Sequence, residues 1–219
     1  MEKTKNPFKG KAQSTVDKAL IIKITALVLV LAAIVAIIIA CASNSDVKYV
    51  EMTVENYGTI ILKIDMKAAP KTAKNFINLV KRDFYDGTTF HRVISDFMIQ
   101  GGDPEGNGTG SSGKKIKGEF LTNGYDNPIR FERGVIGMAR GEDPNSASCQ
   151  FFICNASSYS TLMLNGSYAA FGWVVEGMDV VDAITEGTAG NAVYNGVISD
   201  KSKQAVITEM KVIKYNESK

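Results

Sequence analysis

The chain has 219 residues, of which 45% are hydrophobic and 22% charged, and its formal net charge is +2. This length allows one sizeable domain and an appendage, and the composition is that of a globular protein rather than a disordered one. Residues 1–23 contain six lysines and two acidic residues, Glu2 and Asp17, so this segment has a formal charge of +4. The rest of the chain therefore has a formal charge of −2. The basic character therefore belongs to the N-terminal tail, and nothing indicates a nucleic-acid surface on the domain.

The first predicted element is the uncharged run ITALVLVLAAIVAIIIACA at residues 24–42. Its 19 residues match the roughly 20 that a helix needs to cross a bilayer, and it has no polar face. Lysines before it favour a cytoplasmic N-terminal segment, residues 1–23, with the rest of the chain on the other side. We therefore expect a single-pass cell-membrane protein whose domain lies outside the cytoplasm.

The covalent state of this segment stays open. Residues 38–41, Ile-Ile-Ala-Cys, resemble a bacterial lipobox, in which the chain is cleaved before Cys41 and lipid is attached to its thiol. In the alternative, Cys41 is a small apolar residue of an uncleaved anchor, because the hydrophobic run exceeds that of ordinary signal peptides. Both alternatives leave the domain membrane-bound.

After a short linker, residues 43–47, the pattern becomes strand-rich over a predicted domain of residues 48–215, with a tail at 216–219. Apolar spacing predicts one helix from Ala69-Pro70 to about Val80 and another from Met178 to Ile184. The predicted strands are VKYVEMTV, TIILKID, GTTFHRVI, FMIQGG, GVIGMA, QFFICN, AAFGWV and KQAVITEMKVIKY. Many short strands with two capping helices suggest a closed antiparallel barrel.

The stretch FHRVISDFMIQGGD, residues 90–103, holds the only histidine of the chain. Strand alternation would place Phe90, Arg92 and Ile94 on one side and His91 on the other. A core strand leaves Arg92 unexplained, because guanidinium groups are seldom buried without a partner. Gln100, just before two glycines, is likewise placed where turns expose side chains, so the stretch is a candidate site.

Other possible sites are weak. Cys149 and Cys154 flank QFFI, and a strand would separate them by about 16 Å, so we expect two free thiols rather than a disulfide. With one histidine and no CxxC, no metal site is expected. GTGSSG at residues 108–113 matches GxGxxG, but the strand-like KKIKGEF follows it, so we expect a solvated loop.

Four blocks together resemble the cyclophilin family of peptidyl-prolyl cis-trans isomerases: FHRVISDFMIQGGD, IKGEF, GMARGEDPNSASCQFFI and LNGSYAAFGWVVEGMDVVDAI. The likeness runs in family order from about Lys48 to Tyr215. It implies a mainly β fold, an eight-stranded barrel capped by two helices, with a substrate groove on its outer face. It also implies X-Pro substrates, no cofactor and a monomeric domain.

Position by position, the resemblance implies Arg92, Gln100 and Phe152 as catalytic residues. Those implied to bind substrate are Phe97, Met98, Ala139, Arg140, Gln150, Met163, Leu164 and Tyr168. Tyr168 stands where relatives have a histidine, and Met163 where many have a tryptophan. An amphipathic Tyr still allows catalysis, whereas the missing Trp leaves at most weak cyclosporin binding.

The expected function is catalysis of rotation about X-Pro bonds to assist protein folding outside the cytoplasmic membrane. One alternative is a chaperone of the same fold that binds proline-containing peptides with little turnover. Another is a thiol or serine hydrolase that uses Cys149 and His91, although no nucleophile motif supports it.

Overall fold

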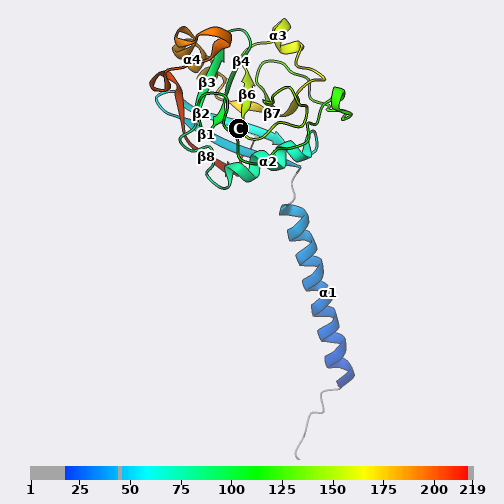
Figure 1. The fold of residues 1–219 in the computed structure, drawn as a ribbon. Coiled ribbons are helices and arrows are strands. Elements are labelled where there is room, and N and C mark those ends of the chain that lie inside the picture. Colours follow the sequence, from blue (N-terminus) through cyan, green and yellow to red (C-terminus); the bar gives the residue numbers. More distant parts are fainter. Residues whose placement is uncertain (1–17, 44–45, 217–219) are drawn as a thin grey trace, which may run out of the picture. The chain divides into compact units, whose positions relative to one another are not determined.

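The computed structural model describes residues 18–43 and 46–216, and the chain divides into two compact units, Met1–Ser45 and Asp46–Lys219. In the first unit, the apolar run predicted as a helix lies in α1 (Lys18–Ser43) (Figure 1). Side chains of α1 are described for residues 21–35, and all of them are exposed. Among the described residues, no helix meets the length and apolarity needed to span a membrane. Most of residues 1–23, the side chain of Cys41 and residues 217–219 lie outside the described part.

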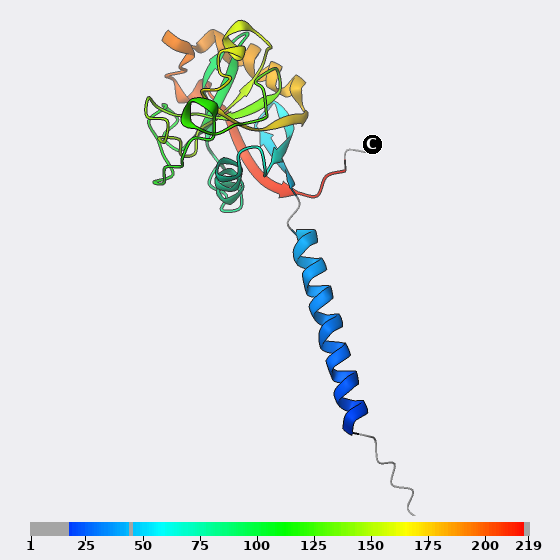
Figure 2. The same ribbon diagram turned by 90° about the vertical axis from the view of Figure 1, so that its right-hand side faces the viewer.

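The second unit is a closed barrel of eight strands, which confirms the predicted fold of the domain (Figures 1 and 2). The order around the barrel is β1-β2-β7-β5-β6-β4-β3-β8, and every pairing is antiparallel. The strands are β1 (Val47–Val54), β2 (Gly58–Asp65), β3 (Thr89–Ile94), β4 (Met98–Asp103), β5 (Val135–Met138), β6 (Phe151–Cys154), β7 (Ala169–Glu176) and β8 (Ala205–Ile213). Closure leaves no free sheet edge.

Two longer helices pack on the barrel where the sequence predicts them, α2 (Pro70–Val80) and α4 (Met178–Thr188). Proline can begin α2 because the first helical N–H needs no partner, and its apolar side chains, including Phe76 and Val80, are buried. Short segments complete the fold: α3 (Tyr159–Leu162), η1 (Leu121–Asn123), η2 (Ala189–Asn191), η3 (Tyr194–Gly196) and η4 (Lys201–Lys203).

Aromatic side chains fill the barrel interior. Phe151 of β6 lies edge-on to Phe76, Tyr85 and Phe90, at ring-centroid distances of 5.6, 5.5 and 6.1 Å. Tyr85 donates from its hydroxyl to the Cys149 carbonyl, so its buried polar atom has a partner. Gly102, with φ +77°, lies so close to these rings that a Cβ there would approach Phe151 to 2.8 Å. The interior is therefore packed and leaves substrate only the outer face.

A bulge in β3 corrects the predicted alternation. Phe90 pairs with Gly101 and Arg92 with Gln100, so His91 is an extra residue in its strand. As a result Phe90 and Val93 both belong to the interior cluster, whereas Arg92 is half-buried at the surface. The predicted common side for Phe90 and Arg92 is thus wrong, because one additional residue reverses the side on which later residues lie.

The glycine-rich segment after β4 is an irregular loop, as predicted, and Asp103 organises it. Its buried carboxylate accepts backbone N–H bonds from Glu105 (2.8 Å), Asn107 (3.2 Å) and Gly108 (2.6 Å). Burial alone raises the pKa of Asp103, but these donors outweigh it and hold the pKa below the ordinary value. The charged form of Asp103 therefore stabilises the loop.

Replacement Asp103→Asn should lower the free energy of unfolding by about 1–3 kcal/mol at neutral pH, because an amide oxygen accepts these bonds less strongly. A depressed folded-state pKa contributes stability above the unfolded-state value of about 3.9, and this stability is lost as the pH falls through the folded-state pKa. Urea unfolding of both proteins at several pH values measures the difference. The difference in unfolding free energy between the two proteins should narrow as the pH falls below about 4. A difference that does not change with pH would contradict the assignment to the charge of Asp103.

Candidate active site

Three predicted catalytic residues form one row across adjacent strands. Arg92 of β3 pairs with Gln100 of β4, which in turn pairs with Phe152 of β6. Cross-strand partners present their side chains on the same face of a sheet, about 5 Å apart. The bulge at His91 is what turns Arg92 to this outer face. The barrel thus brings together residues separated by up to sixty positions in the sequence.

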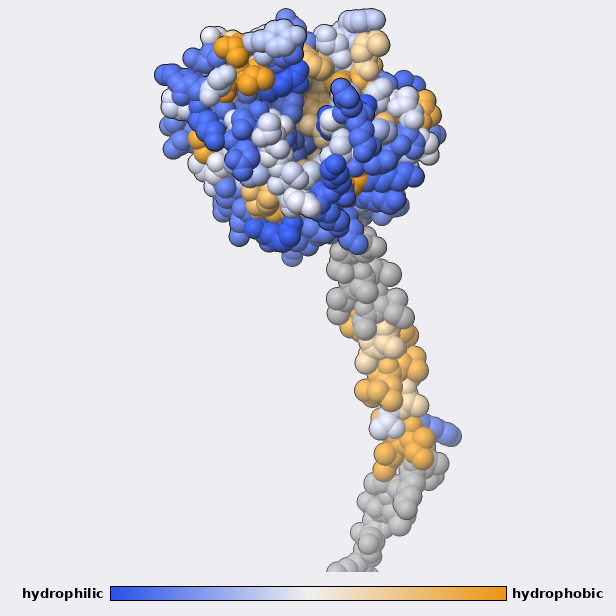
Figure 3. All heavy atoms as spheres, viewed as in Figure 1, coloured by the Kyte–Doolittle hydropathy of each residue, from blue (hydrophilic) through white to orange (hydrophobic). Residues whose placement is uncertain are grey.

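Most of the predicted substrate-binding residues join this row around a cavity of about 160 Å³. The lining residues are Arg92, Phe97, Met98, Gln100, Ala139, Arg140, Phe152, Leu164 and Tyr168. Two of the nine lining residues are arginines, and five have apolar side chains. In the space-filling view, the domain surface is mostly hydrophilic and has a hollow where apolar side chains gather (Figure 3).

Arg92 is held from two sides. Its Nε donates to the backbone carbonyl of Asn195 at 2.8 Å, and its Nη1 donates to Gln100 Oε1 at 3.1 Å. Among the described residues no acceptor contacts Nη2, which leaves its two N–H donors for a ligand. Partial burial lowers the pKa of Arg92 from its ordinary value, and Tyr168 opposes this change. The guanidinium nevertheless stays charged at physiological pH.

Asn195 is a positioning residue that the sequence analysis missed. It lies in η3 with φ +58°, and Val197, two residues further on, forms an isolated β-bridge with Arg92. Asn195-Gly196 is a recognisable turn signal, but a turn signal does not say which side chain the turn will contact.

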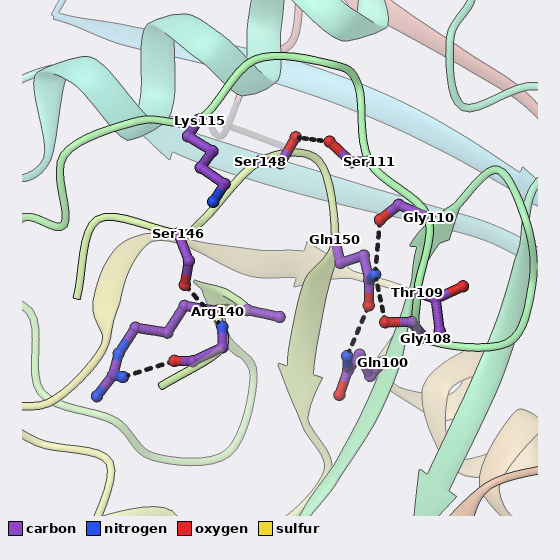
Figure 4. A pocket seen from close by; sticks show the side chains of 12 residues that line it. Gln100, Gly108, Thr109, Gly110, Ser111, Lys115, Arg140, Ser146, Ser148 and Gln150 are labelled. Carbon is purple, nitrogen blue, oxygen red and sulfur yellow. Dashed lines mark hydrogen bonds between the residues drawn. The ribbon is translucent and has the colours of Figure 1, made fainter. Parts of the chain in front are cut away.

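Gln100, which accepts from Arg92, also lines a second hollow of about 310 Å³. Figure 4 shows this hollow and the bonds of Gln100 and Gln150 within it. Gln100 Nε2 donates to Gln150 Oε1 at 3.0 Å, and Gln150 Nε2 donates to the carbonyls of Gly108 and Gly110, both at 3.0 Å. These bonds fix the amide of Gln100 so that its oxygen faces Arg92. Gln150 therefore lines the neighbouring hollow rather than the cavity, and it supports Gln100 from there.

The apolar wall is built around Phe152. Its ring stacks on Phe131, with centroids 5.5 Å apart at 26°, and meets the ring of Tyr168 edge-on at 5.8 Å. Gly137 lies opposite on β5, and a Cβ there would approach Phe152 Cζ to 2.5 Å. Only glycine leaves room for the ring in this position. Phe131 was not predicted, because its segment has no strand or helix pattern.

Arg140 covers the wall of the cavity. Its guanidinium lies 4.7 Å from the Tyr168 ring centroid and 5.1 Å from that of Phe120, within cation–π range. Its Nε also donates to the Ser167 carbonyl at 3.0 Å. The side chain of Arg140, a predicted substrate-binding residue, is thus part of the site.

Met163 and His91 lie apart from the cavity. Met163 follows α3 as its C-cap and is 60% exposed, so the structure does not bring this predicted substrate-binding residue into the lining. The stretch between Gln150 and Gly166 contains α3, and Met163 at the end of this helix is turned outward. His91 is 1% exposed and does not line the cavity, and burial lowers its pKa.

Cys149 and Cys154 are free, as predicted, and both are buried. Burial raises the pKa of Cys149 to about 11 and that of Cys154 to about 12. A nucleophilic cysteine needs the opposite shift, because the thiolate is the reactive form. These environments disfavour the thiol hydrolase. Among residues 46–216 there is also no cluster of three potential metal ligands.

Treatment of the folded domain with iodoacetamide at neutral pH should leave the predicted isomerase activity unchanged, because both thiols are protonated and shielded. Mass spectrometry after denaturation would count the modified thiols, and an exchange assay would measure activity. Inactivation in step with alkylation of Cys149 would contradict the assignment.

Comparison with known proteins agrees with this geometry. The family model described as cyclophilin type peptidyl-prolyl cis-trans isomerase/CLD matches residues 49–212. A Streptomyces antibioticus peptidyl-prolyl cis-trans isomerase is 46% identical over 58% of this chain and 77% of its own. The Escherichia coli peptidyl-prolyl cis-trans isomerase B is 40% identical over 70% of this chain and 93% of its own.

Among solved structures, a Cryptosporidium parvum cyclophilin type isomerase superposes with a TM-score of 0.65 at 27% identity. It covers 78% of this chain and 99% of its own. A second structure of that protein was obtained in the presence of the dipeptide Ala-Pro. The extent of these matches shows that the chain belongs to the cyclophilin family and is a peptidyl-prolyl cis-trans isomerase.

Proposed function

We propose that this isomerase assists the folding of proline-containing polypeptides outside the cytoplasmic membrane, and that Arg92 is its catalytic residue. The observation that carries the catalytic assignment is the fixed guanidinium of Arg92 in the cavity lining, whose Nη2 contacts no acceptor among the described residues.

The chemistry explains why such a group suffices. Rotation about an X-Pro bond breaks amide resonance against a barrier of about 18–20 kcal/mol, although the two planar forms differ by only about 0.5–1 kcal/mol. In the twisted state the lone pair localises on the prolyl nitrogen, which becomes a hydrogen-bond acceptor. A donor placed there binds the twisted state more tightly than either planar state and lowers the barrier. No bond is cleaved, so no nucleophile or general base is needed.

The remaining groups hold the two sides of the rotating bond. Phe97, Met98, Phe152 and Leu164 form the apolar surface for the pyrrolidine ring. Gln100 orients Arg92 and offers polar atoms to the peptide backbone, and its own orientation is set by Gln150. Ala139, Arg140 and Tyr168 complete the wall.

Exchange NMR on a short Ala-Pro peptide, with the domain from Asp46 onward, tests turnover directly. Accelerated exchange supports the proposal. Binding without acceleration would contradict it and favour the proline-binding chaperone. Sedimentation of the same sample tests our expectation of a monomer.

We also propose that residues 24–42 attach the chain to the cell membrane, as a single pass or through lipid on Cys41. The uncharged run, the preceding lysines and the exposed apolar side chains within residues 21–35 support this (Figure 3). Carbonate extraction of membranes tests attachment, and release of the chain would contradict it. Intact mass then distinguishes a product that starts at Met1 from one that starts at a lipidated Cys41.

Cyclosporin binding is expected to be weak. Trp173, the only tryptophan, lies on β7 and does not line the cavity. Calorimetric titration of the domain would contradict this expectation if it showed nanomolar affinity.

A further inference from the structure

A hollow with a concentration of positive charge lies away from the catalytic cavity. Its volume is about 400 Å³, and it is lined by Lys71, Lys74, Asn75, Asn78, Lys114, Lys115, Ile116 and Lys117. Five of the eight lining residues are lysines and none is acidic. The chain beyond residue 23 carries a formal charge of −2, so the net charge of the domain does not explain this cluster. We call this hollow the lysine groove.

One wall of the groove is the exposed face of α2. Lys71, Lys74, Asn75 and Asn78 recur at the spacing that aligns side chains on one face of a helix, while the apolar residues of the other face are buried. The first N–H groups of the helix are already satisfied: those of Lys71 and Thr72 donate to the carboxylate of Glu119, at 3.0 and 2.9 Å. The anion-binding character of the groove thus depends on lysine side chains.

The other wall is the segment 114–117. Ile116 is buried, and its N–H donates to the Ala147 carbonyl at 2.8 Å, so the lysines on either side of it are turned outward. Asn75 of α2 donates to the adjacent Ser148 carbonyl at 2.6 Å. Both walls are therefore fixed to residues 147–148, and the groove is a built feature. The ion pairs among residues 46–216 involve Lys67, Arg133 and Lys211, and none of the five groove lysines takes part in them.

The groove lies near the point where the chain enters the domain. The Met66 N–H donates to the Asp46 carbonyl at 2.7 Å, and Lys67 forms an ion pair with the Asp46 carboxylate at 2.6 Å. Helix α2 begins four residues after Met66, at Pro70, and Figures 1 and 2 show it at the same end of the barrel as the start of β1. The predicted linker of residues 43–47 reaches at most about 18 Å.

We infer that the lysine groove binds the phosphate headgroups of anionic phospholipids in the membrane to which the chain is attached. This inference rests on the proposed membrane attachment. A short tether keeps this end of the domain close to the bilayer, and an anionic surface attracts each nearby lysine by about 1 kcal/mol, or roughly fivefold in affinity. Contact there would restrict how the domain is oriented on the membrane. A single-stranded nucleic acid fits less well, because none of the lining residues is aromatic.

The test uses the domain from Asp46 onward, which contains every strand of the barrel and its core. This domain is one of the two compact units of the chain. The Cryptosporidium isomerase aligns with this chain over 99% of the Cryptosporidium protein's own length. Flotation with vesicles of phosphatidylcholine, with or without phosphatidylglycerol, measures binding at low and at physiological salt. We expect binding only to the charged vesicles, weakening as salt rises.

The groove variant replaces Lys71, Lys74, Lys114 and Lys117 by glutamine, and Lys115 is kept because it also lines the hollow next to the catalytic cavity. The matched control replaces four other exposed lysines by glutamine, Lys81, Lys201, Lys203 and Lys214. The groove variant should bind charged vesicles at least about tenfold more weakly, with normal isomerase activity, while the control binds like the wild type.

Three results would overturn the inference: no binding of the wild type to charged vesicles, equal losses in both variants, or binding of soluble polyphosphate without binding to vesicles. If the groove variant misfolds, the double change Lys114→Gln and Lys117→Gln leaves α2 intact and should still weaken binding severalfold. The domain used for flotation lacks residues 24–42, so the flotation experiment tests only the lysine groove. Attachment through residues 24–42 is tested separately by carbonate extraction of the full chain.

Discussion

Replacing Arg92 by alanine should lower kcat/KM for an Ala-Pro peptide by about a hundredfold to a thousandfold. The variant loses a donor that binds the twisted amide more strongly than the planar one, and loss of one such preorganised donor has effects of this size. Because Arg92 is half-buried at the surface and its partners Asn195 and Gln100 keep access to water, the fold should survive. Exchange NMR gives the rate, and urea unfolding gives the stability.

The matched control is Arg82→Ala, which removes an exposed arginine in the turn after α2 whose Nε donates to the Asn78 carbonyl. This variant should keep wild-type activity. Arg92→Lys should fall between the two, because an ammonium group keeps the charge but lacks the planar set of donors on separate nitrogens that bonds Asn195 and Gln100 and leaves Nη2 available. Wild-type kcat/KM in a folded Arg92→Ala variant would contradict the role assigned to this residue.

The neighbouring residues Phe151 and Phe152 should separate stability from catalysis. Phe151 points into the barrel, fully buried among aromatic rings, so Phe151→Ala should lower the free energy of unfolding by about 3–5 kcal/mol. Phe152 points outward, and one side of its ring borders the cavity. Phe152→Ala should cost less stability but reduce kcat/KM at least about tenfold, because the pyrrolidine ring loses its apolar contact.

Urea unfolding and exchange NMR on both variants, under conditions where each is folded, make the comparison. Phe152→Leu serves as a control that keeps an apolar side chain, and it should recover part of the activity. If the Phe151 variant lost more catalysis than the Phe152 variant at equal folded fraction, the assignment of inner and outer faces would be contradicted.

Local patterns predicted the elements of the domain well. Alternating apolar residues located the strands, and proline at the start of a helical stripe located α2, because each pattern reflects burial of a single face of its own segment. Closure of the barrel was a weaker inference from the number of short strands. The likeness to cyclophilins supported the same architecture independently.

The site was predicted mainly from motif resemblance. Where the structure differs from that prediction, the difference has a physical cause. Met163 was placed by motif position, but α3 turns it away from the cavity. The bulge at His91 reverses the alternation expected for β3, since a strand pattern gives no sign of an extra residue. Asn195 supports Arg92 from more than a hundred residues away, and no local signal connects them.

By itself, the sequence determined the charge distribution, the apolar N-terminal run, the strand and helix segments and the residue types available for chemistry, because all of these depend on neighbours along the chain. Only the tertiary structure decided which donors of Arg92 are free, how Gln150 fixes Gln100, and that five lysines from two segments line one groove. These properties depend on barrel closure and strand register, which bring distant residues within hydrogen-bonding distance and set the side on which each lies.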